Sequence, residues 1–271
     1  MKAIIPAAGH GTRFYPVAKS IPKEMLPIGN KPAIQHIVEE AIAAGAEEVI
    51  IVTSPDKPAL MQYFAPNTEL QKRLIHRPEQ LAAIEHLDQL SKKVRFVFQH
   101  EQAGLGHAVL QATHLVEHEK EPVLILLGDA LVRSTVPCAC EMVDISRRLG
   151  GISVVGLEQV SVEKVSRYGI VDGEKTGDIA VWKLRRLVEK PTPEEAPSDL
   201  AIAGRYLLDP EIFTYLKQER IGHGGEIQLT DAIQCLLADK EIYGFQYPGK
   251  RFDIGNPEGY LEALLGFSSI G

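Results

Sequence analysis

The sequence is poor in cysteine, with Cys138, Cys140 and Cys235 as the only three among 271 residues. Three thiols are too few for a disulfide framework, and Cys138 with Cys140 lacks the second pair that a zinc site needs. We therefore expect reduced thiols, as in a cytoplasmic protein. Long apolar runs are missing too, and residues 1–8 do not have the layout of a signal peptide. These absences predict a protein that does not enter the membrane.

Positive charge is also in short supply. The chain has 29 lysines and arginines against 36 acidic residues, a net charge of -7 and an isoelectric point of about 5.8. This balance argues against a broad basic face for nucleic acid, although it leaves room for a local phosphate pocket. A composition of 45% hydrophobic and 24% charged residues is typical of a globular protein.

Short apolar runs alternate with helical patterns over the first 130 residues. Strands are expected at residues 3–5, 49–52, 94–98 and 123–127, and helices at residues 33–44, 58–64, 70–90 and 106–114. This order predicts an α/β fold with a doubly wound, mostly parallel, Rossmann-like sheet. Beyond residue 150 we expect strands at 152–157, 184–188, 201–207 and 242–247, helices near 210–216, 226–237 and 257–265, and a turn-rich stretch at 172–178.

A loop rich in small residues follows the first expected strand, with Gly9 and Gly11 in it. In an open α/β sheet, a loop at the carboxyl end of a strand is a natural ligand site, and its N–H groups can hold phosphate oxygens. The glycines alone are weak evidence, because the third glycine of a dinucleotide fingerprint and the lysine of a P-loop are absent. Arg13, Lys19 and Lys23 follow closely among three prolines, and this combination suits a polyphosphate.

These segments resemble the nucleotide-sugar pyrophosphorylases. The resemblance begins with Gly9-x-Gly11-Thr12-Arg13, Pro-Lys-Glu-Met-Leu-Pro at residues 22–27 and Lys31-Pro32. It continues through residues 104–109, 168–170, 188–191, 201–206, 225–232 and 251–255, so it covers nearly the whole chain. It implies one glycosyltransferase-A-like nucleotidyltransferase domain over residues 1–271. Residues 1–150 would mainly bind nucleotide, and residues 151–271 would form a smaller sugar-phosphate-binding β extension with a C-terminal helix.

The resemblance also implies a reaction. The Pro-Lys-Glu-Met-Leu-Pro segment favours the uridylyl-transferring branch, in which UTP and α-D-glucose 1-phosphate give UDP-glucose and pyrophosphate. The attacking phosphate oxygen is already ionised at neutral pH, so the enzyme needs no general base. It must align two anions and neutralise the leaving group, and we therefore expect cations, backbone donors and Mg²⁺. The expected partners are these small molecules and further copies of the chain, in a dimer or tetramer.

Nucleotide-binding residues are expected at the glycine loop and near residue 100. We place the catalytic cations Arg13 and Lys23 on the triphosphate, since a guanidinium can grip two oxygens and an ammonium acts as a point charge. By resemblance, Glu24 contacts the ribose hydroxyls, and Gln99 reads the base with its amide. The resemblance also places the nucleotide against Ala7, Ala8, Gly9, Gly11, Thr12 and Gly104.

Metal and sugar sites are expected further along the chain. Asp129 follows an apolar strand and Asp253 lies between apolar neighbours, and two carboxylates suit Mg²⁺ because phosphate oxygens and water complete its ligand shell. By resemblance, Glu189 contacts sugar hydroxyls and Lys190, a third catalytic cation, holds the sugar phosphate. Gly169 and Gly204 are expected to let the backbone meet the sugar ring. For Glu226 two readings stay open, a hydroxyl contact and a helix cap.

Three segments depart from the family pattern, and the third departure bears on nucleotide choice. Ala18 stands where threonine is common, His10 replaces a leucine, and Gly128-Asp129-Ala130 replaces Pro-Asp-Asp, as in thymidylyltransferase relatives. Transfer from dTTP, or to another hexose 1-phosphate, is therefore an alternative. A second alternative is a non-catalytic nucleotide-sugar-binding regulatory homologue. A dinucleotide-dependent dehydrogenase is a distant third, because its fingerprint is incomplete.

Overall fold

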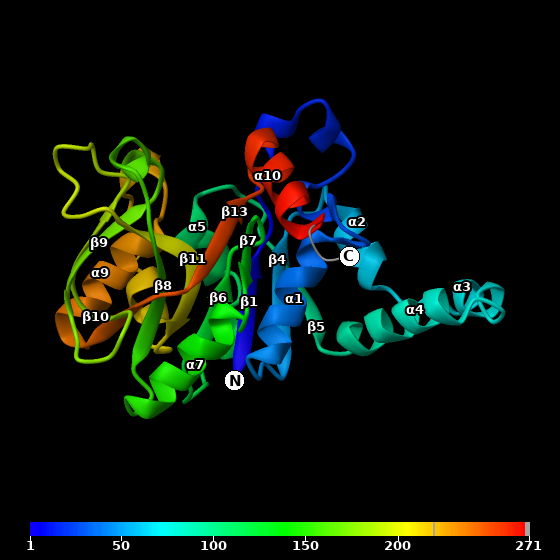
Figure 1. Ribbon diagram of the computed structural model, residues 1–271, viewed down its shortest axis with the longest axis horizontal. Coiled ribbons are helices and arrows are strands. Elements are labelled where there is room, and N and C mark those ends of the chain that lie inside the picture. The colour runs from blue at the N-terminus through cyan, green and yellow to red at the C-terminus, as the bar shows by residue number, and fades with distance from the viewer. Residues whose placement is uncertain (219, 269–271) are drawn as a thin grey trace.

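The computed structural model describes residues 1–218 and 220–268 (Figure 1). Its centre is a nine-stranded sheet in the order β5-β4-β1-β6-β11-β8-β12-β10-β9. The strands β5 (Val94–Phe98), β4 (Glu48–Thr53), β1 (Lys2–Pro6) and β6 (Val123–Leu126) run parallel, as predicted. Helices cover both faces of this half, and the apolar residues of β1, β4 and β6 are almost all buried, whereas those of the edge strand β5 are only partly buried.

Beyond β6 the sheet is mixed. The strand β11 (Leu200–Leu208) is antiparallel to β6 and to β8 (Ser153–Gln159), and β12 (Ile242–Gln246) is parallel to β8. The strands β10 (Val181–Glu189) and β9 (Gly169–Lys175) continue antiparallel to the edge. The expected turn at residues 172–178 is wrong for its first four residues, which belong to β9. An edge strand leaves one side open to water, so polar residues such as Asp172 and Glu174 are tolerated there.

Two helical layers enclose the sheet. One core packs under α1 (Ala33–Ala43), α2 (Pro58–Phe64), α4 (Pro78–Ser91), α7 (Cys138–Arg148) and α10 (Pro257–Ser268). The other packs under α5 (Leu105–Leu110), α6 (Thr113–Val116), α8 (Ile212–Leu216) and α9 (Leu229–Asp239). Within the described ranges no helix is long and apolar enough to cross a membrane.

Several boundaries differ from those expected. The helix predicted at 70–90 is divided into α3 (Thr68–Arg73) and α4, because Pro78 starts a new helix and disfavours helical backbone before it. These two helices project from the body of the molecule (Figure 1). The helix predicted at 106–114 is likewise divided into α5 and α6. The helix expected from residue 226 begins at Leu229 with Gln228 as its N-cap.

Short elements complete the fold. A ribbon of β7 (Ala130–Ser134) and β13 (Gly249–Asp253) places Asp253 opposite Ala130. A second ribbon pairs β2 (Pro27–Ile28) with β3 (Lys31–Pro32). Short 3₁₀ helices form η1 (Thr12–Phe14), η2 (Val17–Lys19), η3 (Lys23–Met25), η4 (Val162–Arg167) and η5 (His223–Gly225). The first ribbon matters most here, because it brings Asp253 beside the end of β6.

Candidate active site

A cavity of about 290 Å³ opens at the carboxyl ends of the parallel strands. The glycine loop after β1, the η3 turn, the β5–α5 connection and the residues after β6 all contribute to it. Its lining includes nine of the predicted site residues, namely Ala7, Ala8, Gly9, Lys23, Glu24, Gln99, Gly104, Asp129 and Glu226. The cavity therefore brings together most of the residues expected at the nucleotide, Glu226 from the expected sugar site and one of the two acids expected at the metal.

The glycine loop is held from behind by Lys57, a residue that the sequence analysis missed. Its ammonium group donates to the carbonyl of Ala7 at 2.9 Å, to the carbonyl of Gly9, and to both oxygens of Glu24 at 3.0 and 3.2 Å. A peptide N–H points opposite to the carbonyl of the same planar unit. The N–H groups that follow Ala7 and Gly9 therefore point away from Lys57, which is the orientation that a phosphate-binding loop needs.

The carboxylate of Glu24 is almost fully buried, with an exposed fraction of 1%. Burial raises the pKa of Glu24 above its usual value, although the charges of Lys57 and Lys23 act in the opposite direction. The carboxylate of Glu24 accepts two hydrogen bonds from Lys57. A contact between Glu24 and the ribose remains a prediction.

Three charged side chains lie close together beside the cavity, those of Lys23, Asp129 and Asp253. The Nζ of Lys23 lies 2.5 Å from Oδ2 of Asp129. A Cβ added to Gly255 would lie 2.9 Å from Oδ1 of Asp253, 3.2 Å from Oδ2 of Asp129 and 3.8 Å from Nζ of Lys23. The backbone also ties the two acid segments together, because the N–H of Ile254 donates to the carbonyl of Asp129 at 2.8 Å. The two acids predicted to bind metal thus face the same small space beside the cavity.

In this cluster of Lys23, Asp129 and Asp253, the opposite charges more than offset the effect of burial on the pKa values of Lys23 and Asp129. Burial alone would raise the pKa of the Asp129 carboxyl, but the charge and hydrogen bond of Lys23 hold that pKa below its usual value. Burial also acts to lower the pKa of Lys23, and the carboxylates of Asp129, Glu24 and Asp253 more than offset it, so this pKa lies above its usual value. Both groups are therefore charged at neutral pH.

The structure does not bring Arg13, Thr12 or Gly11 into the lining of this cavity. Arg13 and Thr12 are exposed on the η1 turn, and Gly11 adopts a left-handed φ of 63° against the stem of Lys23. Arg13 therefore stays a predicted triphosphate contact that the described geometry does not show.

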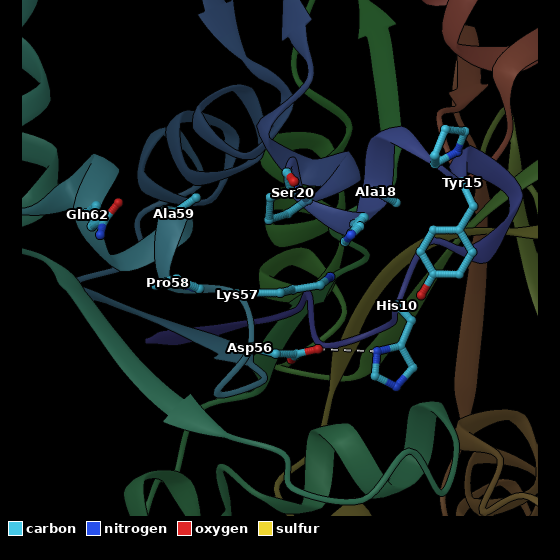
Figure 2. Close-up of a pocket in the computed structure, with 12 residues that line it drawn as sticks. His10, Tyr15, Ala18, Ser20, Asp56, Lys57, Pro58, Ala59 and Gln62 are labelled. Carbon is cyan, nitrogen blue, oxygen red and sulfur yellow. Dashed lines mark ion pairs between the residues drawn. The ribbon is translucent and has the colours of Figure 1, made fainter.

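A second cavity, of about 580 Å³, lies beside the glycine loop (Figure 2). His10, Tyr15 and Lys19 line it from the loop, and Asp56 and Lys57 line it from the start of α2. His10 Nδ1 lies 3.6 Å from Oδ2 of Asp56 across its mouth. Lys57 therefore lines this second cavity, while its ammonium group binds the carbonyls of Ala7 and Gly9, which line the first.

Three of the expected sugar-binding residues, Gly169, Glu189 and Lys190, form a polar group that does not line this cavity. Oε2 of Glu189 accepts a hydrogen bond from Thr230 at 2.7 Å, and its Oε1 lies 3.0 Å from Nζ of Lys190. Gly169 pairs with Glu189 across β9 and β10. Lys190 has a left-handed φ of 45°, an uncommon conformation for a residue with a side chain. Thr230 was not predicted as a site residue, although it lies in the recognised segment at residues 225–232.

Two of the predicted glycines have packing reasons of their own. A Cβ on Gly104 would lie 2.7 Å from Cβ of Glu226 and 2.7 Å from the carbonyl oxygen of Ile227. A Cβ on Gly204 would lie 3.0 Å from Leu127, which lines the cavity.

Glu226 lies three residues before α9, so the helix-cap reading is wrong for it. Its Oε2 instead accepts a hydrogen bond from Gln228 at 3.0 Å.

This cavity, built at the carboxyl ends of a parallel sheet from cationic, acidic and glycine-rich segments, suits phosphate transfer. A model of the nucleotidyl transferase family matches residues 2–268, and the chain belongs to this family. It is 43% identical over 269 residues to "UTP--glucose-1-phosphate uridylyltransferase 1" of Staphylococcus saprophyticus, covering 98% of this chain and 92% of the relative. It is 42% identical over 272 residues to the "UTP--glucose-1-phosphate uridylyltransferase" of Bacillus subtilis, covering 98% and 90%.

Solved structures show the same similarity. A UDP-glucose pyrophosphorylase complexed with UDP-glucose is 39% identical, with a TM-score of 0.87 over 99% of this chain and 98% of that one. A UTP-bound UGPase from Acinetobacter baumannii is 35% identical, with a TM-score of 0.86 over 98% and 92%. The likeness spans nearly the full length of both partners in each case.

Proposed function

We propose that this chain joins UTP to α-D-glucose 1-phosphate, forming UDP-glucose and releasing pyrophosphate. Relatives that carry this activity in their names are 42–43% identical over 98% of the chain. The observation that carries the proposal in this molecule is the meeting of Lys23, Asp129 and Asp253 beside the cavity. A regulatory homologue without catalysis has no use for such a cluster.

The donor set fits Mg²⁺. Two carboxylates face the space that Gly255 leaves open, and Mg²⁺ prefers a few carboxylates together with phosphate oxygens and water. Within the described ranges no three acidic, histidine or cysteine side chains form a possible metal site, so the protein would supply only Asp129 and Asp253. When bound there, the ion would neutralise charge on the triphosphate and orient it.

The protein groups perform the remaining steps. The N–H groups after Ala7 and Gly9 would receive phosphate oxygens, and Lys23 would move from Asp129 to the triphosphate as nucleotide enters. Lys190 would hold the sugar phosphate so that one of its oxygens attacks the α-phosphorus in line with the departing pyrophosphate. No proton transfer is needed, because the attacking phosphate oxygen is already ionised at neutral pH and the bridging oxygen leaves with the bond electrons as part of the pyrophosphate anion. Catalysis therefore rests on alignment and charge neutralisation.

Pyrophosphate release tests the proposal. UTP, dTTP, CTP and ATP would each be combined with several hexose 1-phosphates, with Mg²⁺ or with a chelator in excess. We expect release with UTP, glucose 1-phosphate and Mg²⁺ together, and none after chelation. Asp129→Asn should lower the rate, whereas Asp178→Asn, an exposed carboxylate paired with Arg148, serves as the matched control. Folded protein that releases no pyrophosphate in any combination overturns the proposal, and a preference for dTTP or another sugar redirects it.

Two further expectations accompany this function. The three cysteines are free thiols, and we propose a cytoplasmic location for the enzyme. A homo-oligomer, dimer or tetramer, remains a prediction that sedimentation would test.

A further inference from the structure

A row of three side chains leads away from the nucleotide cavity. Gln99 lines the cavity, His107 lies in α5, and Gln111 directly follows α5. Gln99 has an exposed fraction of 2%. Its Nε2 lies 2.9 Å from Nδ1 of His107 and 3.4 Å from the carbonyl oxygen of Gly104. On the far side of the ring, Nε2 of His107 lies 3.1 Å from Nε2 of Gln111.

A neutral imidazole cannot satisfy both amide nitrogens. It carries one N–H and one lone pair, so it accepts from one glutamine and must donate to the oxygen of the other. In the first arrangement, Gln99 donates its amide N–H to Nδ1, and the Nε2–H of His107 donates to Oε1 of Gln111. In the second, the Nδ1–H of His107 donates to Oε1 of Gln99, and Gln111 donates to Nε2. The tautomer of His107 therefore sets the orientation of the Gln99 amide.

The fixed backbone carbonyls favour opposite arrangements. The carbonyl of Gly104 attracts Nε2 of Gln99 and so favours the first. The carbonyl of His107 itself accepts from Nε2 of Gln111 at 3.1 Å and so favours the second. A hydrogen bond of this kind is worth only about 1 kcal/mol. A ligand that interacts with one orientation of Gln99 can therefore decide between them.

The base edge supplies that interaction. In the first arrangement Oε1 of Gln99 is the amide atom left for a ligand, and it can accept a hydrogen bond from the N3–H of uracil. Cytosine has a lone pair at N3, which would face this oxygen unfavourably and would suit the second arrangement instead. Given the proposed function, we infer that His107 is a positioning residue for base selection. With UTP bound, its Nε2–H tautomer holds Oε1 of Gln99 toward the base.

Two substitutions at Gln111 separate the arrangements without altering a residue that lines the cavity. Glutamate can only accept and favours the Nε2–H tautomer, whereas lysine can only donate and favours the Nδ1–H tautomer. We expect Gln111→Lys to lower the ratio of kcat/KM for UTP to that for CTP about tenfold, and Gln111→Glu to keep or raise it. His114→Ala, at an exposed position on α6, is the matched control.

Nitrogen NMR of the wild-type protein with labelled histidine gives a second readout that requires no variant to fold. Addition of UTP should shift His107 to the Nε2–H tautomer, and addition of CTP should not. The inference is overturned by an Nδ1–H tautomer with UTP, or by folded Gln111 variants whose ratios change in the same direction. Failure of the proposed function looks different, because the wild type would then release no pyrophosphate from UTP at all.

Discussion

The ammonium group of Lys57 lies 3.0 Å from Oε2 of Glu24, and both side chains are buried, with exposed fractions of 7% and 1%. Lys57 comes from the loop after β4 and Glu24 from the η3 turn, while the carbonyls of Ala7 and Gly9 accept from the same ammonium. One cation thus fixes three segments around the nucleotide cavity. A buried pair of this kind does not guarantee stability, but removing one partner leaves an uncompensated charge.

Lys57→Met should destabilise the protein and weaken UTP binding together. The loss should be roughly 3–5 kcal/mol in the free energy of unfolding, because the carboxylate of Glu24 and two backbone carbonyls lose their donor. Urea denaturation measures the first effect and calorimetric titration with UTP the second. The exposed Lys72, paired with Glu69, offers a control, and Lys72→Met should cost less than about 1 kcal/mol.

The double variant Lys57→Met with Glu24→Gln shows whether the orphaned charge causes the loss. It should recover part of the stability, since the neutral amide is cheaper to bury than a carboxylate. A double variant less stable than Lys57→Met would instead mean that the carboxylate has other stabilising partners.

Lys23→Met should lower kcat by roughly 10²–10³, the loss that follows removal of one preorganised donor to developing negative charge in other enzymes. The reason is the position of its ammonium, 2.5 Å from Asp129 and beside the glycine loop. Single-turnover measurements of pyrophosphate release would give the rate of the chemical step. Lys19→Met tests a nearby lysine that lines only the second cavity, and it should retain most of the activity. Equal losses in the two variants would argue against a special role for Lys23.

Much of the fold was predictable from sequence periodicity. The buried strands β1, β4 and β6 have continuous apolar runs, and in β5 only Arg95 interrupts the apolar residues, so the positions of all four were predicted within two residues. The helix α7 and the strands β7 and β13 were missed. In α7 the polar residues at 141, 144 and 146–148 dilute the apolar pattern, and the strand pair draws its stability from long-range pairing rather than from local preference.

The site was predictable where a recognised motif contains the residue, as for Lys23, or where the residue follows the end of a strand, as for Asp129. Lys57 was missed because nothing in its neighbourhood shows that its ammonium reaches Glu24, 33 positions away. Arg205 shows the reverse case: it lies in a recognised segment, yet it is fully buried and pairs with Glu40 at 2.7 Å, so its observed contact is structural. Local sequence shows which residues are reactive, and only the folded chain shows which charges neutralise each other.

Acid stability should depend on Asp129. Its folded pKa lies below the ordinary value of about 3.9, so the unfolded state binds more protons between the two values. The stabilisation is therefore present above about pH 4 and is lost as the pH falls through the folded pKa. In urea denaturation at pH 7, 5 and 3, the difference between wild type and Asp129→Asn should shrink at the lowest pH. A difference that grows on acidification would contradict the lowered pKa, and Asp178→Asn again provides an exposed control.

Lys190→Ala should separate the two substrates. Lys190 lies in the group with Glu189 and Thr230 and does not line the nucleotide cavity, so UTP affinity should change little. Affinity for the sugar 1-phosphate should fall about ten- to a hundredfold, since a charged hydrogen bond is worth roughly 1.5–3 kcal/mol. If Lys190 serves only its half-exposed ion pair with Glu189, the change should cost less than about 1 kcal/mol of stability and leave sugar binding intact.

The backbone of Lys190 calls for a second variant, because its φ of 45° is strained for any residue with a Cβ. Lys190→Gly removes the ammonium and the strain together, whereas Lys190→Ala removes the ammonium alone. Lys190→Gly should therefore melt at a higher temperature than Lys190→Ala, while both lose sugar-phosphate affinity equally, because that loss comes from the charge. Calorimetric titration of each ligand with a melting curve for each variant distinguishes the two effects. If the sugar 1-phosphate binds both variants as tightly as wild type, Lys190 is structural and the acceptor site lies elsewhere.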